Sequence, residues 1–252
     1  MHFVLSPTTK DPISFFISMS SYSCGCVSRY AFLAASALLR SMASPSSSSV
    51  TRVRASVGQT LTQAGPQVKF LVNAAGFGKI GGVRELSVSD QTGMAELNCT
   101  ALTAVTSMVL PFMPNNSRIL QFASSAAFLP QPGFAVYAAT KAYVLSYRRA
   151  LNRELKDRGI SVTAICPGPV KTEFFDIAQT TGEIPLYKQF VMAKPDRVVK
   201  KAIRDSVSRR ELSVYGWTMK AFYLLTKLLP HRLILDVMER IEYAPKGSRW
   251  ES

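Results

Sequence analysis

Short apolar runs recur along the chain after Pro66, each followed by residues that favour a turn. Val68 to Val72 is the first, and it stops at a turn of small residues; Arg118 to Ala123 and Ser161 to Ile165 are two more. Apolar runs of this length, bounded by turn residues, predict buried strands. The stretches that separate them are long enough for helices.

Amphipathic stretches predict helices between and after these strands. Ser89 and Asp90 can cap the first helix, which runs to about Met113. The second runs from Ala135 to Arg158, with Gly159 as its C-terminal cap. The remaining predicted elements are a helix from Pro195 to about Arg210, a last strand from Leu212 to Val214, and an amphipathic helical stretch from Trp217 to Tyr243 that breaks near Pro230.

This alternation of strands and helices predicts an α/β fold. A parallel sheet with helices on both faces, the Rossmann-like doubly wound arrangement, accommodates it best. We expect that core over residues 67–215 and an amphipathic helical extension over residues 216–252. Ligands of such sheets bind at the carboxyl ends of the strands, so candidate chemistry is sought there.

Residues 1–66 differ in character from the rest. They are serine-rich, with a run at Ser46 to Ser49, and Asp11 is their single acidic residue. We find no sustained helix or strand period before about Val57. A serine-rich, acid-poor, arginine-bearing segment is typical of an organellar transit peptide, and a frame-shifted or misassigned start gives the same composition. Both explanations stay open, and we expect the N-terminal βαβ unit of the sheet to be incomplete.

Composition excludes several classes of protein. Four cysteines are too few and too scattered for a disulfide framework, and two histidines make a hydrolytic triad or a histidine-ligated zinc a poor candidate, so no metal is expected. The net charge of +14 fits nucleic acid, anionic lipid or a phosphate-bearing cofactor. The basic residues are dispersed and not interleaved with aromatics, which argues against nucleic acid. No apolar run approaches the roughly 20 residues that cross a bilayer, so we expect a cytoplasmic protein, with organelle targeting or membrane association as alternatives.

A glycine pattern follows the first predicted strand. Gly76 to Gly81 fits G-x-G-x-x-G, the pattern of a dinucleotide-binding turn. The next helix does not open at Gly81, however, because Val83 to Val88 intervenes. We therefore reject this stretch as the phosphate-binding turn.

Tyr137 and Lys141 are the strongest candidates for chemistry. Four residues apart on a helix, their side chains project from the same face. A nearby ammonium lowers the pKa of a phenol, which makes tyrosine a usable acid or base near neutral pH. On an exposed helix, the same pair would be two solvated side chains.

Other polar residues lie where they can share a crevice with this pair. Ser124 ends a predicted strand thirteen residues before Tyr137, and Ser125 is a competing hydroxyl. Asn98 lies inside the preceding helix, where asparagine is a poor choice because its amide competes with the backbone. Pro167 and Gly168 follow the next strand and would form another wall.

Together these residues resemble the short-chain dehydrogenase/reductase family, and Val136 to Phe175 is most similar to its DltE-like members. The resemblance covers about Val68 to Val214. The pieces that carry it are Asn73, Ala74, Ala75 and Gly76 in one turn, Asn98, Ser124, Tyr137 with Lys141, and Pro167 and Gly168 with Thr172.

The family implies an NAD(P)-dependent oxidoreductase that moves a hydride between nicotinamide and a carbonyl or secondary alcohol. Tyr137 would be the acid or base, Ser124 would polarise the substrate oxygen, and Lys141 would hold the nicotinamide ribose and depress the pKa of Tyr137. Asn98 would position a water that relays protons to Lys141.

The resemblance also implies residues that bind the cofactor. The turn from Asn73 through Ala74 and Ala75 to Gly76 would line the adenosine side. The loop from Pro167 through Gly168 to Thr172 would cover the nicotinamide, alongside Tyr137 and Lys141.

The chain departs from the family at its N-terminal end. Members begin with a strand and a T-G-x-x-x-G-x-G turn that grips the pyrophosphate, and nothing between Met1 and Pro66 matches this. A truncated, catalytically impaired relative and a non-catalytic interaction protein are therefore alternatives. The strand end that selects NAD or NADP is missing, and the positive charge favours NADP.

Three further expectations concern partners and folding. Without a first βαβ unit, the strand Val68 to Val72 would have an unpaired edge, which predicts poor solubility or partner pairing. The resemblance implies a homo-oligomer joined through the two long helices. The helices after Trp217 could pack as a core or dimer face, cover the substrate pocket or lie on a membrane surface.

Overall fold

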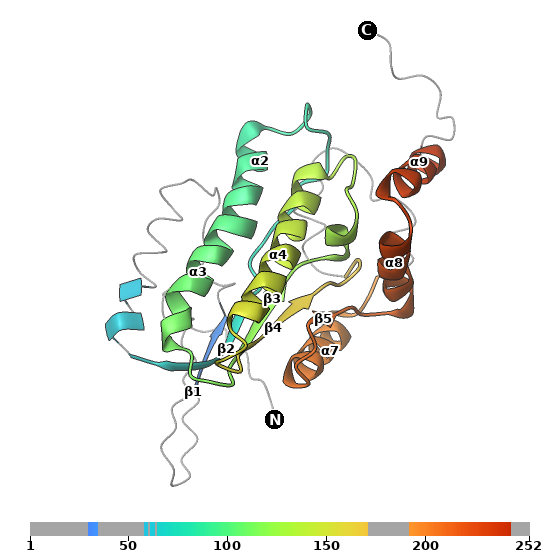
Figure 1. The fold of residues 1–252 in the computed structure, drawn as a ribbon. Coiled ribbons are helices and arrows are strands. Elements are labelled where there is room, and N and C mark those ends of the chain that lie inside the picture. The colour runs from blue at the N-terminus through green and yellow to red at the C-terminus, as the bar shows by residue number, and fades with distance from the viewer. Residues whose placement is uncertain (1–29, 35–57, 60, 64, 171–191, 243–252) are drawn as a thin grey trace.

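Five parallel strands form one sheet in the computed structural model, which describes residues 30–34, 58–59, 61–63, 65–170 and 192–242 (Figure 1). Neighbouring strands follow chain order, β1-β2-β3-β4-β5. Helices lie between β2 and β3, between β3 and β4 and between β4 and β5, as parallel connections require. The predicted α/β, Rossmann-like fold is confirmed. The strands are β1 (Tyr30–Ala34), β2 (Gln67–Asn73), β3 (Arg118–Phe122), β4 (Ser161–Ile165) and β5 (Leu212–Ser213).

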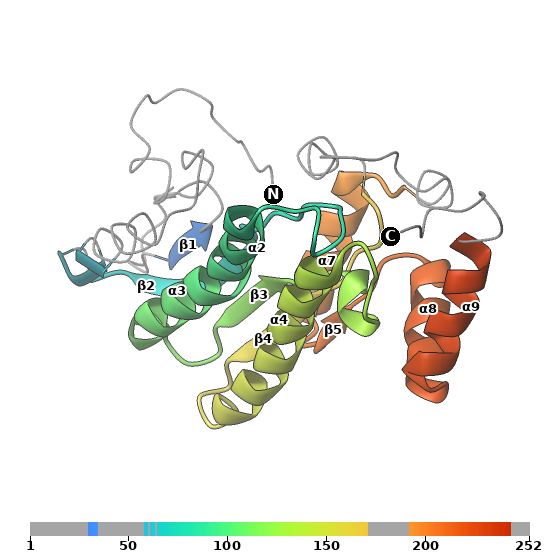
Figure 2. The ribbon, with the colours of Figure 1, turned by 90° about the horizontal axis from the view of Figure 1, so that it is seen from above.

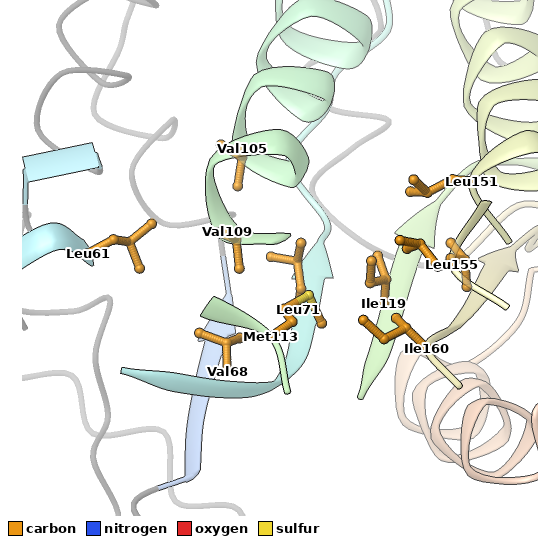
Figure 3. Close-up of a cluster of buried hydrophobic side chains, with 11 residues drawn as sticks. Leu61, Val68, Leu71, Val105, Val109, Met113, Ile119, Leu151, Leu155 and Ile160 are labelled. Carbon is orange, nitrogen blue, oxygen red and sulfur yellow. The ribbon is translucent and has the colours of Figure 1, made fainter. Parts of the chain in front are cut away.

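Alternate residues of the central strands face opposite layers of helices. Leu71, Ile119 and Val162 are in register across β2, β3 and β4, and all three are buried in one core cluster with residues of α3 (Leu102–Val109) and α4 (Ala135–Glu154). Figure 3 shows this cluster between the sheet and the two helices. The neighbouring residue Leu120 is buried on the other face, against Val198 of α7 (Pro195–Val207). Helices therefore cover both faces of the sheet, as predicted (Figure 2).

The first long helix is composite. It runs through α2 (Val88–Ala95), a π-helical segment η2 (Glu96–Ala101), α3 and the short 3₁₀ segment η3 (Leu110–Phe112). Its cap is Ser87, whose hydroxyl accepts a hydrogen bond from the backbone N–H of Asp90 at 3.0 Å. The helix cap predicted at Ser89 and Asp90 is therefore wrong by two residues. Ser87 is the cap because its hydroxyl reaches the backbone N–H of Asp90, three residues later.

The second long helix, α4, ends earlier than predicted. It stops at Glu154, and the chain turns so that Leu155 enters the core. Gly159 has a left-handed φ of 62°, as a C-terminal glycine should, but it closes the turn that follows the helix. The predicted end at Arg158 is corrected to Glu154.

The edge of β2 that faces away from β3 is paired with another strand. β1 pairs with β2 in parallel, although the sequence showed no strand period there. The stretch Tyr30–Ala34 is a five-residue apolar run, too short to display a period, and its pairing with β2 is what makes it a strand. The expectation that β2 has an unpaired edge is wrong, and the poor solubility predicted from that edge loses its basis.

Two helices complete the described chain. α8 (Trp217–Leu228) and α9 (His231–Glu242) break around Pro230, as predicted. Figure 2 shows them side by side, beyond the β5 end of the sheet. In the part of the chain that the structure describes, none of the helices combines the length and apolar character needed to cross a bilayer. The three parts proposed for the chain, 1–66, 67–215 and 216–252, stay a prediction.

Candidate active site

The carboxyl ends of β3 and β4 bring the predicted catalytic hydroxyl close to the tyrosine. Ser124 follows β3 in extended conformation and caps the short helix η4 (Ser125–Phe128), accepting a hydrogen bond from the N–H of Ala126 at 3.2 Å. The N–H of Ser125 donates to the carbonyl of Pro167 at 2.9 Å, which ties the loop after β3 to the loop after β4. The Ser124 hydroxyl hydrogen-bonds the Tyr137 phenol. Of the two competing serines, this contact favours Ser124.

Tyr137 and Lys141 lie on the buried face of α4. Their exposed fractions are 7% and 5%, so they are not a solvated surface pair. The Lys141 Nζ donates to the carbonyl oxygen of Phe122 at 2.9 Å and lies 5.6 Å from the centre of the Tyr137 ring. The Phe134 ring stacks on the Tyr137 ring, with centres 4.3 Å apart, and fixes its orientation. The helix spacing therefore does what the sequence predicted: it places an ammonium beside a phenol.

Burial sets the proton affinities of both side chains. It raises the pKa of Tyr137 to about 12, while the hydrogen bond from Ser124 acts in the opposite direction. Burial also lowers the pKa of Lys141 to about 8, opposed by Cys99 and Cys166. The expected depression of the Tyr137 pKa is wrong for this structure, because burial destabilises the phenolate by more than the hydrogen bond from Ser124 stabilises it. At neutral pH the phenol is protonated and the ammonium is mostly charged.

Asn98 holds the loop after β2 against the two helices. It is fully buried in the π-helical segment, and its side chain accepts from the N–H of Phe77 at 3.1 Å and donates to the carbonyl of Phe77 at 2.9 Å. It also donates to the hydroxyl of Thr140 at 3.0 Å. The side-chain amide is thus bound to protein on both sides, and a water relay from Asn98 to Lys141 stays a prediction.

The glycines of this loop are required by close packing. A Cβ at Gly76 would lie 2.8 Å from the Asn98 Oδ1 and 3.1 Å from the Lys141 Nζ. A Cβ at Gly78 would lie 2.7 Å from the Tyr137 Cδ2. The glycine pattern therefore lets the backbone approach Tyr137 and Lys141, and its rejection as a phosphate-binding turn agrees with the next helix beginning only at Val88.

The remaining predicted cofactor residues lie around this centre. Asn73 ends β2, and its Nδ2 donates to the Thr106 hydroxyl at 2.9 Å; its buried Oδ1 has no hydrogen-bond partner among the described residues. Ala74 and Ala75 continue into the loop, half-buried. Pro167 and Gly168 follow β4, and a Cβ at Gly168 would lie 2.6 Å from the Met219 Sδ. Thr172 lies outside the described residues.

The sequence analysis missed residues that position the candidate side chains Tyr137 and Lys141. The Phe134 ring, Gly78 and the carbonyl of Phe122 all contact Tyr137 or Lys141. Phe134 precedes Tyr137 by three residues, a helical spacing that could have signalled the ring stack. The carbonyl of Phe122 left no signal, because every residue carries one.

Similarity to known proteins covers more than half of the chain. A family model described as short chain dehydrogenase matches residues 35–181, more than half of the chain. The uncharacterized oxidoreductase YbbO of Escherichia coli K12 is 29% identical over 178 residues, covering 67% of this chain and 66% of YbbO. The very-long-chain 3-oxoacyl-CoA reductase-B of Danio rerio is 31% identical over 190 residues, covering 73% of this chain and 60% of the reductase. The chain thus spans less than two thirds of the length of either relative.

Solved structures share the fold. A short-chain dehydrogenase from Sphingobium yanoikuyae in complex with NADPH superposes with a TM-score of 0.58 at 24% identity, over 80% of this chain and 74% of that one. A short chain dehydrogenase/reductase from Burkholderia phymatum in complex with NAD gives a TM-score of 0.59 at 20% identity, over 81% and 76% of the two chains. Both likenesses concern the fold alone.

Proposed function

Because the chain belongs to the short-chain dehydrogenase family, we propose that it is an NAD(P)-dependent oxidoreductase acting on a carbonyl group or a secondary alcohol. The observation that carries the proposal is the buried cluster of Ser124, Tyr137 and Lys141 at the carboxyl edge of the sheet. A phenol and an ammonium are rarely buried side by side without a use, since each must give up its water.

The protonation states favour the direction of carbonyl reduction. When bound, the nicotinamide supplies the hydride that adds to the carbonyl carbon. The Ser124 hydroxyl donates a hydrogen bond to the substrate oxygen, and Tyr137 transfers its phenolic proton to that oxygen, which completes the alcohol. The charged Lys141 stabilises the phenolate that remains, and solvent returns the proton. A phenol with a pKa of about 12 starts the cycle as the acid that this step needs.

The residues fit one end of the cofactor. Lys141 has three N–H donors and, within the described residues, donates to the Phe122 carbonyl alone, which leaves donors for ribose hydroxyls. We propose that the turn from Asn73 to Gly76 lines the adenosine side and that the loop from Pro167 towards Thr172 covers the nicotinamide. Two structures of the same fold hold NADPH and NAD, and the net charge of +14 favours NADP through its extra phosphate.

A second candidate is a relative that keeps the site but binds the cofactor too weakly to turn over. The observation behind it is the sequence after β1, where the next glycine after Ala34 is Gly58. A glycine-rich turn at that place would present backbone N–H groups to the pyrophosphate. Cofactor binding separates the two candidates, and a non-catalytic interaction protein predicts no binding at all.

Other properties stay proposals. We propose a small-molecule substrate, a homo-oligomer joined through α2, α3 and α4, and a cytoplasmic location. The DltE-like assignment within the family stays a prediction as well.

The test is a screen of ketones and aldehydes with NADPH and NADH, followed by loss of nicotinamide absorbance. Tyr137→Phe should lower kcat by roughly 100-fold or more, because general acid catalysis contributes about that much. Tyr143→Phe is the matched control, since Tyr143 lies on the same helix, is exposed and hydrogen-bonds Thr103 away from the site. A Tyr137→Phe variant as active as the parent would refute the proposed role.

A further inference from the structure

Helix α8 has one face committed to the core. Met219, Phe222 and Tyr223 pack against a buried cluster that includes Phe128 of η4. The Phe128 ring centre lies 4.8 Å from that of Tyr223 and 6.3 Å from that of Phe222. Thr226, one turn further along, is buried as well. The spacing 219, 222, 223 and 226 is the stripe of a helix packed on one side.

The opposite face of the same helix is apolar and exposed. One stripe of the helix carries Trp217, Leu224 and Leu228, which follow one another at intervals of seven and four residues. Their exposed fractions are 80%, 57% and 72%. On α9, Leu233 and Val237 are also apolar and exposed, with exposed fractions of 50% and 49%. Large apolar side chains exposed along one stripe of a helix mark an interaction site.

The charges beside the stripe on α8 are basic. Lys220 and Lys227 are exposed on α8, and Arg232 is exposed at the start of α9. No acidic residue occurs in the sequence from Leu212 to Leu235, and the next residue, Asp236 of α9, is an exposed carboxylate. The exposed face therefore combines large apolar side chains, a tryptophan and three basic residues, with Asp236 as the one exposed carboxylate among its described residues.

We propose that this face, which we call the α8–α9 face and define by Trp217, Leu224, Leu228, Leu233 and the adjoining basic residues, docks on the surface of an anionic lipid bilayer. The apolar stripe enters the boundary between headgroups and acyl chains, and the basic side chains meet the anionic headgroups. α8 has twelve residues, about 18 Å at 1.5 Å per residue, which suits lying in the interface and falls short of the roughly 30 Å hydrocarbon core.

The charge pattern favours a bilayer over a second copy of the chain. A symmetric pair formed through the α8 stripe would bring Lys220 and Lys227 of both copies together, with no carboxylate on α8 to offset them. An anionic surface is attracted by the same residues. Helix α8 adjoins the candidate active site through its core face, where Met219 lies against Gly168. The proposal does not depend on catalysis.

The experiment is flotation of the full chain with vesicles of phosphatidylcholine alone and of phosphatidylcholine with phosphatidylserine. We expect binding to the phosphatidylserine vesicles that weakens as salt is added. The double variant Lys220→Gln, Lys227→Gln should bind about 30-fold more weakly, at about fivefold per lysine. The double variant Leu224→Gln, Leu228→Gln should bind at least roughly tenfold more weakly, since two apolar side chains no longer enter the interface.

Val207→Gln is the matched control, because Val207 is an exposed apolar residue of α7, 56% exposed, away from the α8–α9 face. It should bind as the parent does. All substituted side chains are exposed, and unchanged thermal unfolding would show that each variant folds. Absence of vesicle binding, equal binding to both vesicle types, or full binding by the leucine variant would each overturn the proposal. A dimer in sedimentation equilibrium that the leucine variant dissociates would assign the face to a second copy instead.

Discussion

Replacing the buried lysine should make the protein more stable while it destroys the site. Lys141 is 5% exposed, and its pKa falls from 10.5 to about 8 on folding. At about 1.4 kcal/mol per pKa unit, keeping it charged in the folded protein costs about 3 kcal/mol below pH 8. Lys141→Met removes this cost but leaves the Phe122 carbonyl without its hydrogen bond, which costs about 1 kcal/mol. The net expectation is a variant about 2 kcal/mol more stable at pH 7.

The stability advantage of Lys141→Met over the parent should depend on pH. Between about pH 8 and pH 10.5, the unfolded chain keeps the Lys141 proton and the folded chain has lost it, so the unfolded state binds more protons and the stability of the parent rises with pH. The remaining cost of Lys141 falls to about 1 kcal/mol at pH 9.5, so the advantage of the variant should shrink by about 2 kcal/mol.

The assay is urea unfolding of parent and variant at both pH values. Lys200→Met is the matched control, because Lys200 is an exposed lysine of α7 whose removal changes the net charge equally. Its difference from the parent should be small at both pH values. A Lys141→Met variant less stable than the parent at neutral pH, or a difference that does not change with pH, would refute the reasoning.

Three more predictions test the site and the core. Gly76→Ala should lower the free energy of unfolding by about 1–3 kcal/mol and also reduce kcat/KM, because its Cβ would crowd the Asn98 amide and the Lys141 ammonium. Urea unfolding and steady-state kinetics check this, and a variant unchanged in both would contradict it. Carbonyl reduction should decline above about pH 8 as Lys141 loses its proton, while Tyr137, with a pKa of about 12, stays protonated; a pH–rate profile flat up to pH 10 would contradict this. Val144→Ala, at a fully buried position, should destabilise the fold by about 2 kcal/mol in thermal or urea unfolding, and a loss below about 0.5 kcal/mol would count against the packing described.

Much of the fold could be predicted because its signals are local. The runs that became β2, β3 and β4 are apolar and bounded by turn residues, and the break at Pro230 follows from proline chemistry. β1 could not be predicted, because Tyr30–Ala34 becomes a strand by pairing with β2 across a long separation in sequence. The end of α4 was misplaced for a similar reason, since burial of Leu155 in the core stops the helix.

Some features of the candidate site could be predicted from the sequence, and others could not. The helical spacing of Tyr137 and Lys141 and the strand-end position of Ser124 were readable from sequence, and the structure brings all three together. The direction of the Tyr137 pKa was not readable, because the spacing reveals the neighbouring ammonium but not the loss of water around both groups. The partners of Asn98 depend on the path of the loop at Phe77, which packing decides.

Titration of the full chain with NADPH and NADH, following nicotinamide fluorescence and thermal stability together, tests the central claim most directly. The account predicts saturable binding in about the micromolar range, tighter for NADPH, and weaker binding by Lys141→Met. Absence of binding up to millimolar cofactor would contradict it and would leave the buried Ser124, Tyr137 and Lys141 as a site without a cofactor.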